Sequence, residues 1–239
     1  RTSFTWGIKV PNHSKHVIYV WLDALTNYLS ALNFPNTNDK LYKNFWPASL
    51  HVIGKDILRF HAIYWPAFLL AANIKPPIRI FSHGWILSDE KKMSKSRGNI
   101  LNPLEIIKSY GVDELRYYLM KEVSHGSDGS ISLKSLENCI NSDLANNYGN
   151  LCQRVFSFIK NNCANKVGKR KKISDSDKKL IEETKRLTKD LRNEMDMQNL
   201  NNYIKSVINI SFLTNKYIND EEPWKLKKTN SEKMNNILH

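Results

Sequence analysis

Residues 50–83 read LHVIGKDILRFHAIYWPAFLLAANIKPPIRIFSH and decide the fold. The run LHVIG is short, apolar and β-branched and ends at a glycine, which is typical of a buried strand. Residues 56–72 then have the length and composition of a helix, and NIKPP interrupts them before a second strand, IRIFSH. A strand, a helix and a further strand in this order indicate a parallel sheet covered by helices.

The segment before this stretch repeats the pattern. VIYVW at 17–21 predicts another short strand, and DALTNYLSAL from Asp23 predicts the helix that follows it. Ligands of open α/β sheets bind beyond the carboxyl ends of the strands. The turns WLD at 21–23 and GKD at 54–56 come at those ends, so we expect a ligand site there.

The chain after the strands is helical. NPLEIIKSYG at 102–111 predicts a helix with Asn102 as N-cap, Pro103 in its first turn and Gly111 as its stop. Apolar residues then keep helical spacing, which predicts a helical bundle. They are Leu144, Tyr148, Leu151, Val155 and Phe158, then Leu180, Thr184, Leu187, Leu191 and Met195, then Leu200, Ile204, Val207 and Ile208.

The turn-rich stretch SHGSDGSIS at 124–132 separates the two parts. We therefore expect an α/β domain over 1–124, a connecting region over 125–142 and a helical domain over 143–239. Within the helical domain, KVGKRKK at 166–172 predicts a basic loop between helices. Such a loop is either solvated or in contact with a phosphate backbone.

The composition is that of a basic globular protein. With 36 Lys and Arg against 23 Asp and Glu, the formal net charge is +13, which favours a polyanionic partner such as nucleic acid. Three cysteines without a CxxC pair argue against a disulfide framework or zinc site and for a reducing compartment. No apolar stretch has membrane-spanning length, so we expect a protein of the cytoplasm or of an organellar matrix.

A second basic stretch, DEKKMSKSRGN at 89–99, has the residue types that hold phosphates. Lysine supplies a point charge, and serine hydroxyls and backbone N–H groups add donors of shorter range. Its string KMSKS at 92–96, followed by RGN, matches the nucleotide-binding signature of class I aminoacyl-tRNA synthetases.

Within that class the chain resembles the methionyl-tRNA synthetase family. Five further motifs fall in that family's order: YVWLDALTNY at 19–28, HVIGKDILRFH at 51–61, FSHGW at 81–85, GVDELRYYLM at 111–120 and EPWK at 222–225. The resemblance implies the second half of a Rossmann-like catalytic domain, followed by an α-helical anticodon-binding bundle. It also implies that methionine reacts with ATP, as its magnesium complex, to give methionyl-adenylate, and that the methionyl group then passes to tRNA(Met).

The resemblance also implies roles for individual residues. Lys95 would stabilise the charge on the leaving pyrophosphate, with Lys92 supporting it. The ATP-binding set is Lys92, Ser94, Lys95, Gly54 and Asp56, and the methionine-binding set is Trp21, Ala24, Tyr28, Ile57 and His61. Aromatic walls suit a polarisable thioether. Taken without the resemblance, Trp21 and Tyr28 are ordinary core aromatics, and Asp56 is an N-cap for the following helix.

Three residues of the helical part match the family's anticodon-reading positions. Asn150 and Arg154 lie four residues apart, on one face of a helix, and Trp224 follows a proline. Amide and guanidinium groups can read the edges of unpaired bases that stack on an aromatic ring. The alternative is an ordinary helix surface beside a Pro-Trp corner.

Two elements of the family have no counterpart in these 239 residues: the His-Ile-Gly-His-like motif of the first half of the nucleotide fold, and the connective domain where some members bind zinc. We therefore expect an internal segment of the synthetase, without a zinc site, that is inactive without its N-terminal half. The alternatives are another class I synthetase, for isoleucine, valine, leucine or cysteine, and a tRNA-binding segment without chemistry.

Overall fold

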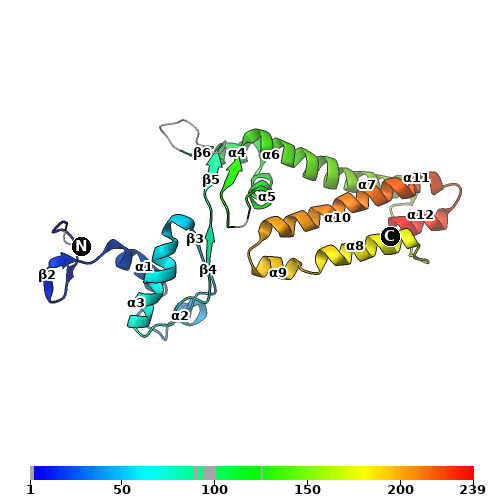
Figure 1. The fold of residues 1–239 in the computed structure, drawn as a ribbon. Helices are drawn as coiled ribbons and strands as arrows, with labels where there is room; N and C mark the ends of the chain where they lie inside the picture. The colour runs from blue at the N-terminus through cyan, green and yellow to red at the C-terminus, as the bar shows by residue number, and fades with distance from the viewer. Residues whose placement is uncertain (1–2, 89–90, 94–100, 125) are drawn as a thin grey trace. The chain divides into compact units, whose positions relative to one another are not determined.

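The computed structural model (Figure 1) describes residues 3–88, 91–93, 101–124 and 126–239, without the side chains at 91 and 92. The chain forms two compact units, Arg1–Trp85 and Ile86–His239. This division by packing differs from the predicted domain limits, 1–124, 125–142 and 143–239, which stay a prediction about function.

The first unit contains the predicted parallel strand pair. Its elements are β1 (Lys9–Val10), β2 (His13–Val17), α1 (Val20–Ser30), α2 (Lys40–Phe45), β3 (His51–Gly54), the 3-10 turn η1 (Lys55–Ile57), the π-helical turn η2 (Phe60–Tyr64), α3 (Trp65–Ala71) and β4 (Ile80–His83). Strands β3 and β4 are parallel, with His51 opposite Ile80 and Gly54 opposite His83. The strand, helix and strand predicted from residues 50–83 are therefore confirmed.

The strand predicted at 17–21 is wrong. Val17 ends β2, which pairs antiparallel with β1, and α1 already begins at Val20. The apolar run is divided between two elements. Val17 is buried at the end of the hairpin, whereas Leu25 and Leu29 form the buried face of the helix that follows. Helical periodicity from residue 21 onward thus overrides the β-branched run.

The core of the first unit lies between α1 and α3. Its buried members are Leu25, Leu29, Trp46, Trp65 and Leu69. Full burial of such a side chain stabilises the fold by roughly 1.5–3 kcal/mol. These contacts hold α1 and η2 together, and the site residues come from both.

The second unit combines a small sheet with helices. Its elements are β5 (Ile86–Ser88), β6 (Lys91–Lys92), α4 (Pro103–Tyr110), α5 (Val112–Glu122), β7 (Gly129–Ile131), α6 (Leu133–Cys139), the π-helical segment η4 (Ile140–Gly149), α7 (Asn150–Asn162), α8 (Asp175–Thr188), α9 (Leu191–Asp196), α10 (Leu200–Glu221), α11 (Pro223–Leu226) and α12 (Ser231–Leu238). Strand β5 is central, antiparallel to β6 and parallel to β7. β7 lies in the stretch that we expected to supply only turns.

Helix α4 follows its predicted caps. The Leu104 N–H donates to Asn102 Oδ1 at 3.0 Å, and Pro103 is the first helical residue. Gly111 has φ 111°, a conformation that side-chain-bearing residues rarely adopt, and α5 begins directly after it. The glycine therefore ends one helix and allows the chain to turn into the next.

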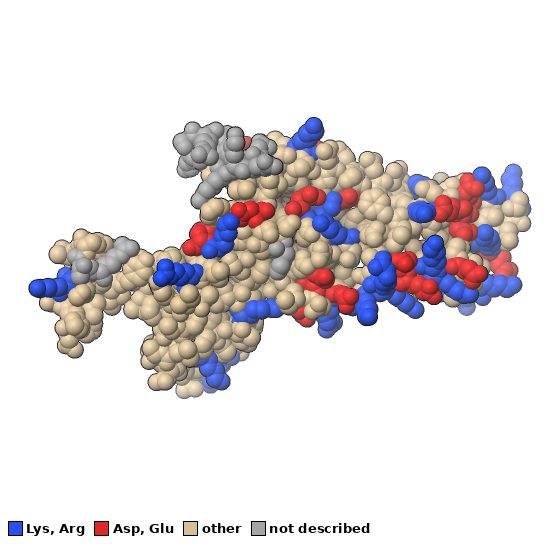
Figure 2. Space-filling view, viewed as in Figure 1, with Lys and Arg blue, Asp and Glu red and all other residues tan. Residues whose placement is uncertain are grey.

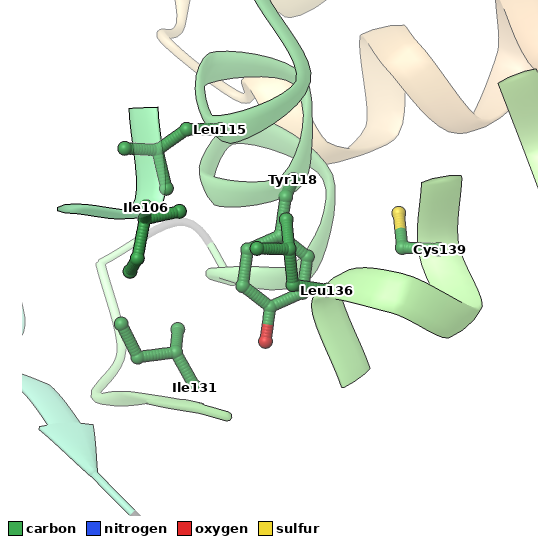
Figure 3. Packing of buried hydrophobic residues seen from close by; sticks show 6 residues of the cluster. All are labelled: Ile106, Leu115, Tyr118, Ile131, Leu136 and Cys139. Atoms are coloured by element: carbon green, nitrogen blue, oxygen red, sulfur yellow. The ribbon is translucent and has the colours of Figure 1, made fainter. Parts of the chain in front are cut away.

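A buried cluster joins the sheet to the first helices of this unit. Figure 3 shows the buried side chains of this cluster, which come from α4, α5, β7 and α6: Ile106, Leu115, Tyr118, Ile131, Leu136 and Cys139. Because Ile131, Leu136 and Cys139 belong to this core, the predicted connecting region is an integral part of the second unit.

The remaining helices form the predicted bundle. Helix α10 packs along α8 and also contacts α5, α7, α9 and η4, and α7, α8 and α10 run side by side in Figure 1. Residues 166–172 lie between α7 and α8 outside any helix or strand, as expected. None of the described helices has the length and hydrophobicity to span a membrane.

Candidate functional site

An aromatic cluster in the first unit joins three of the predicted methionine-binding residues. Tyr28 Oη lies 2.9 Å from His61 Nε2, and the Trp21 and His61 rings meet edge to face with centroids 6.2 Å apart. Trp21 and Tyr28 lie about two turns apart on one face of α1, and His61 comes from η2. Packing of α1 against the α3 segment thus brings together residues that are more than 30 positions apart in sequence.

The hydrogen bonds of His61 define its tautomer. Its Nδ1 lies 3.0 Å from the carbonyl oxygen of Ile57, which can only accept, so Nδ1 carries the proton. In the neutral ring Nε2 is then an acceptor, and the Tyr28 hydroxyl donates to it. Burial raises the pKa of Tyr28, which keeps this hydroxyl protonated. The result is one directed chain from Tyr28 through His61 to Ile57.

The other two predicted residues flank this chain. Ile57 supplies its carbonyl from the end of η1 and has a half-buried side chain. Ala24 lies on α1, one turn from both Trp21 and Tyr28, and is exposed. The structure therefore brings together Trp21, Tyr28, Ile57 and His61, and places Ala24 on the same helix as Trp21 and Tyr28.

Two members of the cluster were missed by the sequence analysis. Phe60 stacks on Trp21 with centroids 4.0 Å apart and planes at 8°. His51 lies against Tyr28, with ring centroids 4.3 Å apart, and its buried Nε2 has no hydrogen-bond partner among the residues that the structure describes. Burial, and then the nearby His61, lower the pKa of His51. The sequence did contain a signal for His51: it alternates with Ile53 along β3, so both side chains lie on the buried face of the strand.

A second group of residues lies at the carboxyl ends of the parallel strands. Gly54 ends β3 opposite His83 of β4. The Trp85 indole N–H donates to Asp56 Oδ1 at 2.6 Å, and Lys55 Nζ lies 4.2 Å from the Trp85 ring centroid. The expected ligand-binding edge of the sheet therefore carries a carboxylate, an ammonium group and an indole in contact.

Gly54 lies directly beside this group. A Cβ at Gly54 would lie 3.6 Å from Asp56 Oδ1, in ordinary van der Waals contact. Gly54 itself occupies the N-cap position of η1, and no side chain caps that turn. The alternative reading of Asp56 as an N-cap is therefore wrong, because its Oδ1 accepts the Trp85 N–H instead.

The lysine signature belongs to the second unit. The backbone of Lys92 lies in β6, and Met93 packs against the Ile106 core cluster. Ser94 and Lys95 lie outside the described residues, so their roles, and that of the Lys92 side chain, stay predictions. Among the described residues, no group of three or more His, Cys, Asp or Glu is placed to hold a metal ion.

Two of the predicted RNA-reading residues meet in the second unit. The Arg154 guanidinium lies 5.3 Å from the Trp224 ring centroid, and its Nη2 donates to Asn219 Oδ1 at 2.7 Å. Trp224 is 42% exposed, and it follows the buried Pro223 at the start of α11. Asn150 begins α7 one turn before Arg154 and is exposed.

Comparison with known proteins identifies the family. The family model described as "tRNA synthetases class I (M)" matches residues 1–156. The chain belongs to this family. The lysine signature and its surrounding motifs therefore led to the correct assignment.

Individual members of the family are similar over the whole chain. A methionine–tRNA ligase of Brucella suis is 46% identical over 239 residues, which are all of this chain and 46% of that protein. A methionine–tRNA ligase of Rickettsia bellii is 48% identical over 246 residues, covering 100% of this chain and 47% of its own. The chain spans about half the length of the curated relatives it matches.

Solved structures of the family have the same fold. Methionyl-tRNA synthetase of Mycobacterium tuberculosis in complex with methionyl-adenylate superposes with a TM-score of 0.89 at 43% identity, over 100% of this chain and 48% of that one. Its apo form gives a TM-score of 0.85 at 40% identity, over 100% and 47% of the two chains. This likeness confirms the predicted α/β fold.

Proposed function

We propose that the chain is part of a methionine–tRNA ligase, which activates methionine with ATP and transfers it to tRNA(Met). The observation that carries this proposal is the match over the entire chain, at 46% identity, to a protein named methionine–tRNA ligase. The relatives are about twice as long, so the activity is proposed for the whole protein. The 239 residues by themselves are proposed to be inactive.

The aromatic cluster of the first unit is proposed to hold methionine. Trp21 and the buried His61 supply flat surfaces, and Ala24 and Ile57 supply small or apolar ones. Thioethers are polarisable and pack well against aromatic rings. Since the Tyr28 hydroxyl donates its hydrogen bond to His61, its oxygen can still accept one from a bound ligand.

ATP, as its magnesium complex, is proposed to bind beyond the carboxyl ends of β3 and β4. Gly54 allows close approach of the backbone, and Asp56 offers a carboxylate for hydroxyl groups of the nucleotide. In the proposed reaction a methionine carboxylate oxygen attacks the α-phosphorus, and the bond to the leaving pyrophosphate breaks. Lys92, Ser94 and Lys95 are proposed to bind the phosphates, with Lys95 stabilising the charge on the pyrophosphate.

The tRNA is proposed to present its anticodon to the helical bundle. Trp224 is exposed enough to stack on an unpaired base, and the nearby Arg154 can donate to a base edge. Asn150, on the same helix, is proposed to supply a further amide. The helical bundle of residues 143–239 is thus proposed as the anticodon-binding domain, and residues 1–124 as the catalytic one.

Amino-acid-dependent exchange of pyrophosphate into ATP by the full-length protein tests the reaction. We expect exchange with methionine and not with isoleucine, valine, leucine or cysteine, and we expect Lys95→Ala to reduce it strongly. Exchange with one of the other amino acids would replace the substrate assignment. tRNA binding by an intact, folded protein that shows no exchange with any amino acid would favour a binding segment without chemistry.

A further inference from the structure

The segment between α7 and α8 carries a dense positive charge. Five of the seven residues at 166–172 are Lys or Arg, and none is Asp or Glu: Lys166, Lys169, Arg170, Lys171 and Lys172. All five side chains are exposed. We call residues 166–172 the basic loop.

The basic loop is attached to the last helix. The Lys171 backbone N–H donates to Asn236 Oδ1 at 2.9 Å, and Lys171 Nζ lies 3.6 Å from a carboxylate oxygen of Glu232. Gly168 lies so close to Asn235 that an added Cβ would be 3.0 Å from its Cγ. These contacts hold the middle of the loop on α12, so its charges have a defined place on the protein.

The same helix connects the basic loop to the Trp224 region. Helix α12 packs against α11, which begins at Pro223 and carries Trp224. Just after α11, Lys227 Nζ donates to Asn162 Oδ1 at 2.8 Å, which links this region to the last turn of α7. The basic loop, α11 and the end of α7 therefore belong to one end of the bundle, as Figure 1 shows.

Some lysines near this end pair with carboxylates, but several of the loop do not. Figure 2 shows Asp and Glu interspersed with Lys and Arg over the bundle end, and three ion pairs are Lys225 with Glu222, Lys233 with Glu221, and Lys171 with Glu232. Arg170 acts electrostatically on Asp177. Within the described part of the chain, Lys166, Lys169 and Lys172 form no ion pair with a carboxylate. Unpaired exposed lysines grouped in this way favour a polyanion.

We propose that the basic loop binds the phosphate backbone of the RNA whose unpaired base stacks on Trp224. This inference rests on the proposed function, because it takes tRNA as the partner. Aromatic platforms beside a positive surface are the usual construction for binding single-stranded nucleic acid, since the ring takes the base and the charges take the backbone. The loop contacts carry no sequence information and serve to position the RNA.

The salt dependence of tRNA binding by the full-length protein tests this proposal. The variant is Lys169→Gln with Lys172→Gln, and the matched control is Lys185→Gln with Lys189→Gln. The control pair lies at the other end of α8, about 20 Å farther along the helix, and makes the same change in net charge. Each lost phosphate contact should reduce the slope of log affinity against log salt by about 0.7.

Salt concentrations of 50 and 200 mM differ fourfold. The loss of two contacts therefore changes the ratio of the affinities at these two concentrations by about sevenfold. We therefore expect the wild-type affinity to fall, over this salt range, by a factor about seven times larger than that of the loop variant, and the control variant to follow the wild type. The loss should be the same for tRNAs with different anticodons, because phosphate contacts do not read sequence.

Three outcomes would overturn the proposal: an unchanged slope in the loop variant, an equal change in the control, or a loss that depends on the anticodon. If Trp224→Ala still weakens tRNA binding in any of these cases, the proposed function survives and only the loop assignment fails. If the wild-type protein binds no tRNA, both fail.

Discussion

The ion pair between Lys121 and Asp143 should contribute strongly to the stability of the second unit. Lys121 Nζ lies 2.5 Å from Asp143 Oδ2, and only 18% and 5% of the two side chains are exposed. The same carboxylate accepts hydrogen bonds from Tyr117 Oη at 2.7 Å and from Ser142 Oγ at 3.0 Å. The pair joins α5 to η4, and the perturbation is Asp143→Asn.

The expected cost follows from this geometry. The asparagine oxygen can still accept the Tyr117 hydroxyl, so the main loss is the counter-charge of Lys121. Removing one partner of a buried pair costs about 3–5 kcal/mol. We expect about 3 kcal/mol, because Lys121 keeps some exposure and has Glu122 at 3.3 Å. Adding Lys121→Met removes the uncompensated charge, so the double variant should cost about 2 kcal/mol less than the sum of the single variants.

The stabilisation should depend on pH in a defined direction. Burial by itself would raise the pKa of Asp143, but the hydrogen bonds from Lys121 and Tyr117 outweigh it and hold the pKa below its usual value. A carboxyl whose pKa is lower in the folded state stabilises the fold above its unfolded pKa, near 3.9. The difference between wild type and Asp143→Asn should therefore be complete at pH 7 and disappear as the pH falls through the folded pKa.

Native-state hydrogen exchange measures the opening of α5 and η4 without interference from the first unit. A loss of 3 kcal/mol corresponds to exchange about a hundredfold faster for their protected amides. A change below about 1 kcal/mol at pH 7, or single-variant costs that add within about 0.5 kcal/mol, would refute the reasoning.

Three further predictions concern the first unit. Tyr28→Phe removes the hydrogen bond to the 2% exposed His61 and should raise the KM of the full-length protein for methionine by about tenfold, with the KM for ATP unchanged in pyrophosphate exchange. Trp85→Phe removes the N–H that orients Asp56 and should raise the KM for ATP by about threefold with the KM for methionine unchanged; equal rises in both would contradict that role. His51→Phe replaces a buried nitrogen without a partner and should leave thermal stability equal or higher at pH 7. Because the folded pKa of His51 is lowered, the wild type loses stability as the pH falls below about 6.5, so the advantage of this variant should grow there.

Local signals in the sequence predicted part of the structure accurately. Asn102 and Gly111 delimit α4 as expected, because an N-cap and a positive φ are properties of single residues. The strands β3 and β4 were also predicted, because a short β-branched run bounded by glycine or proline is compatible with few structures other than a strand. The strand predicted for VIYVW was wrong, because a short apolar run without such boundaries fits a strand and a helix equally well, and the packing of Leu25 and Leu29 selects the helix.

The sequence by itself determined the family, the alternation of strands and helices, and the positions of most candidate site residues, because these depend on residue types and spacings along the chain. Tertiary structure decided which of them meet. The chain from Tyr28 through His61 to Ile57, the stack of Phe60 on Trp21 and the attachment of the basic loop to α12 all join residues by packing and hydrogen-bond direction. Such contacts and hydrogen-bond directions arise only when segments distant in sequence pack together, and the spacing of residues along the chain does not specify them.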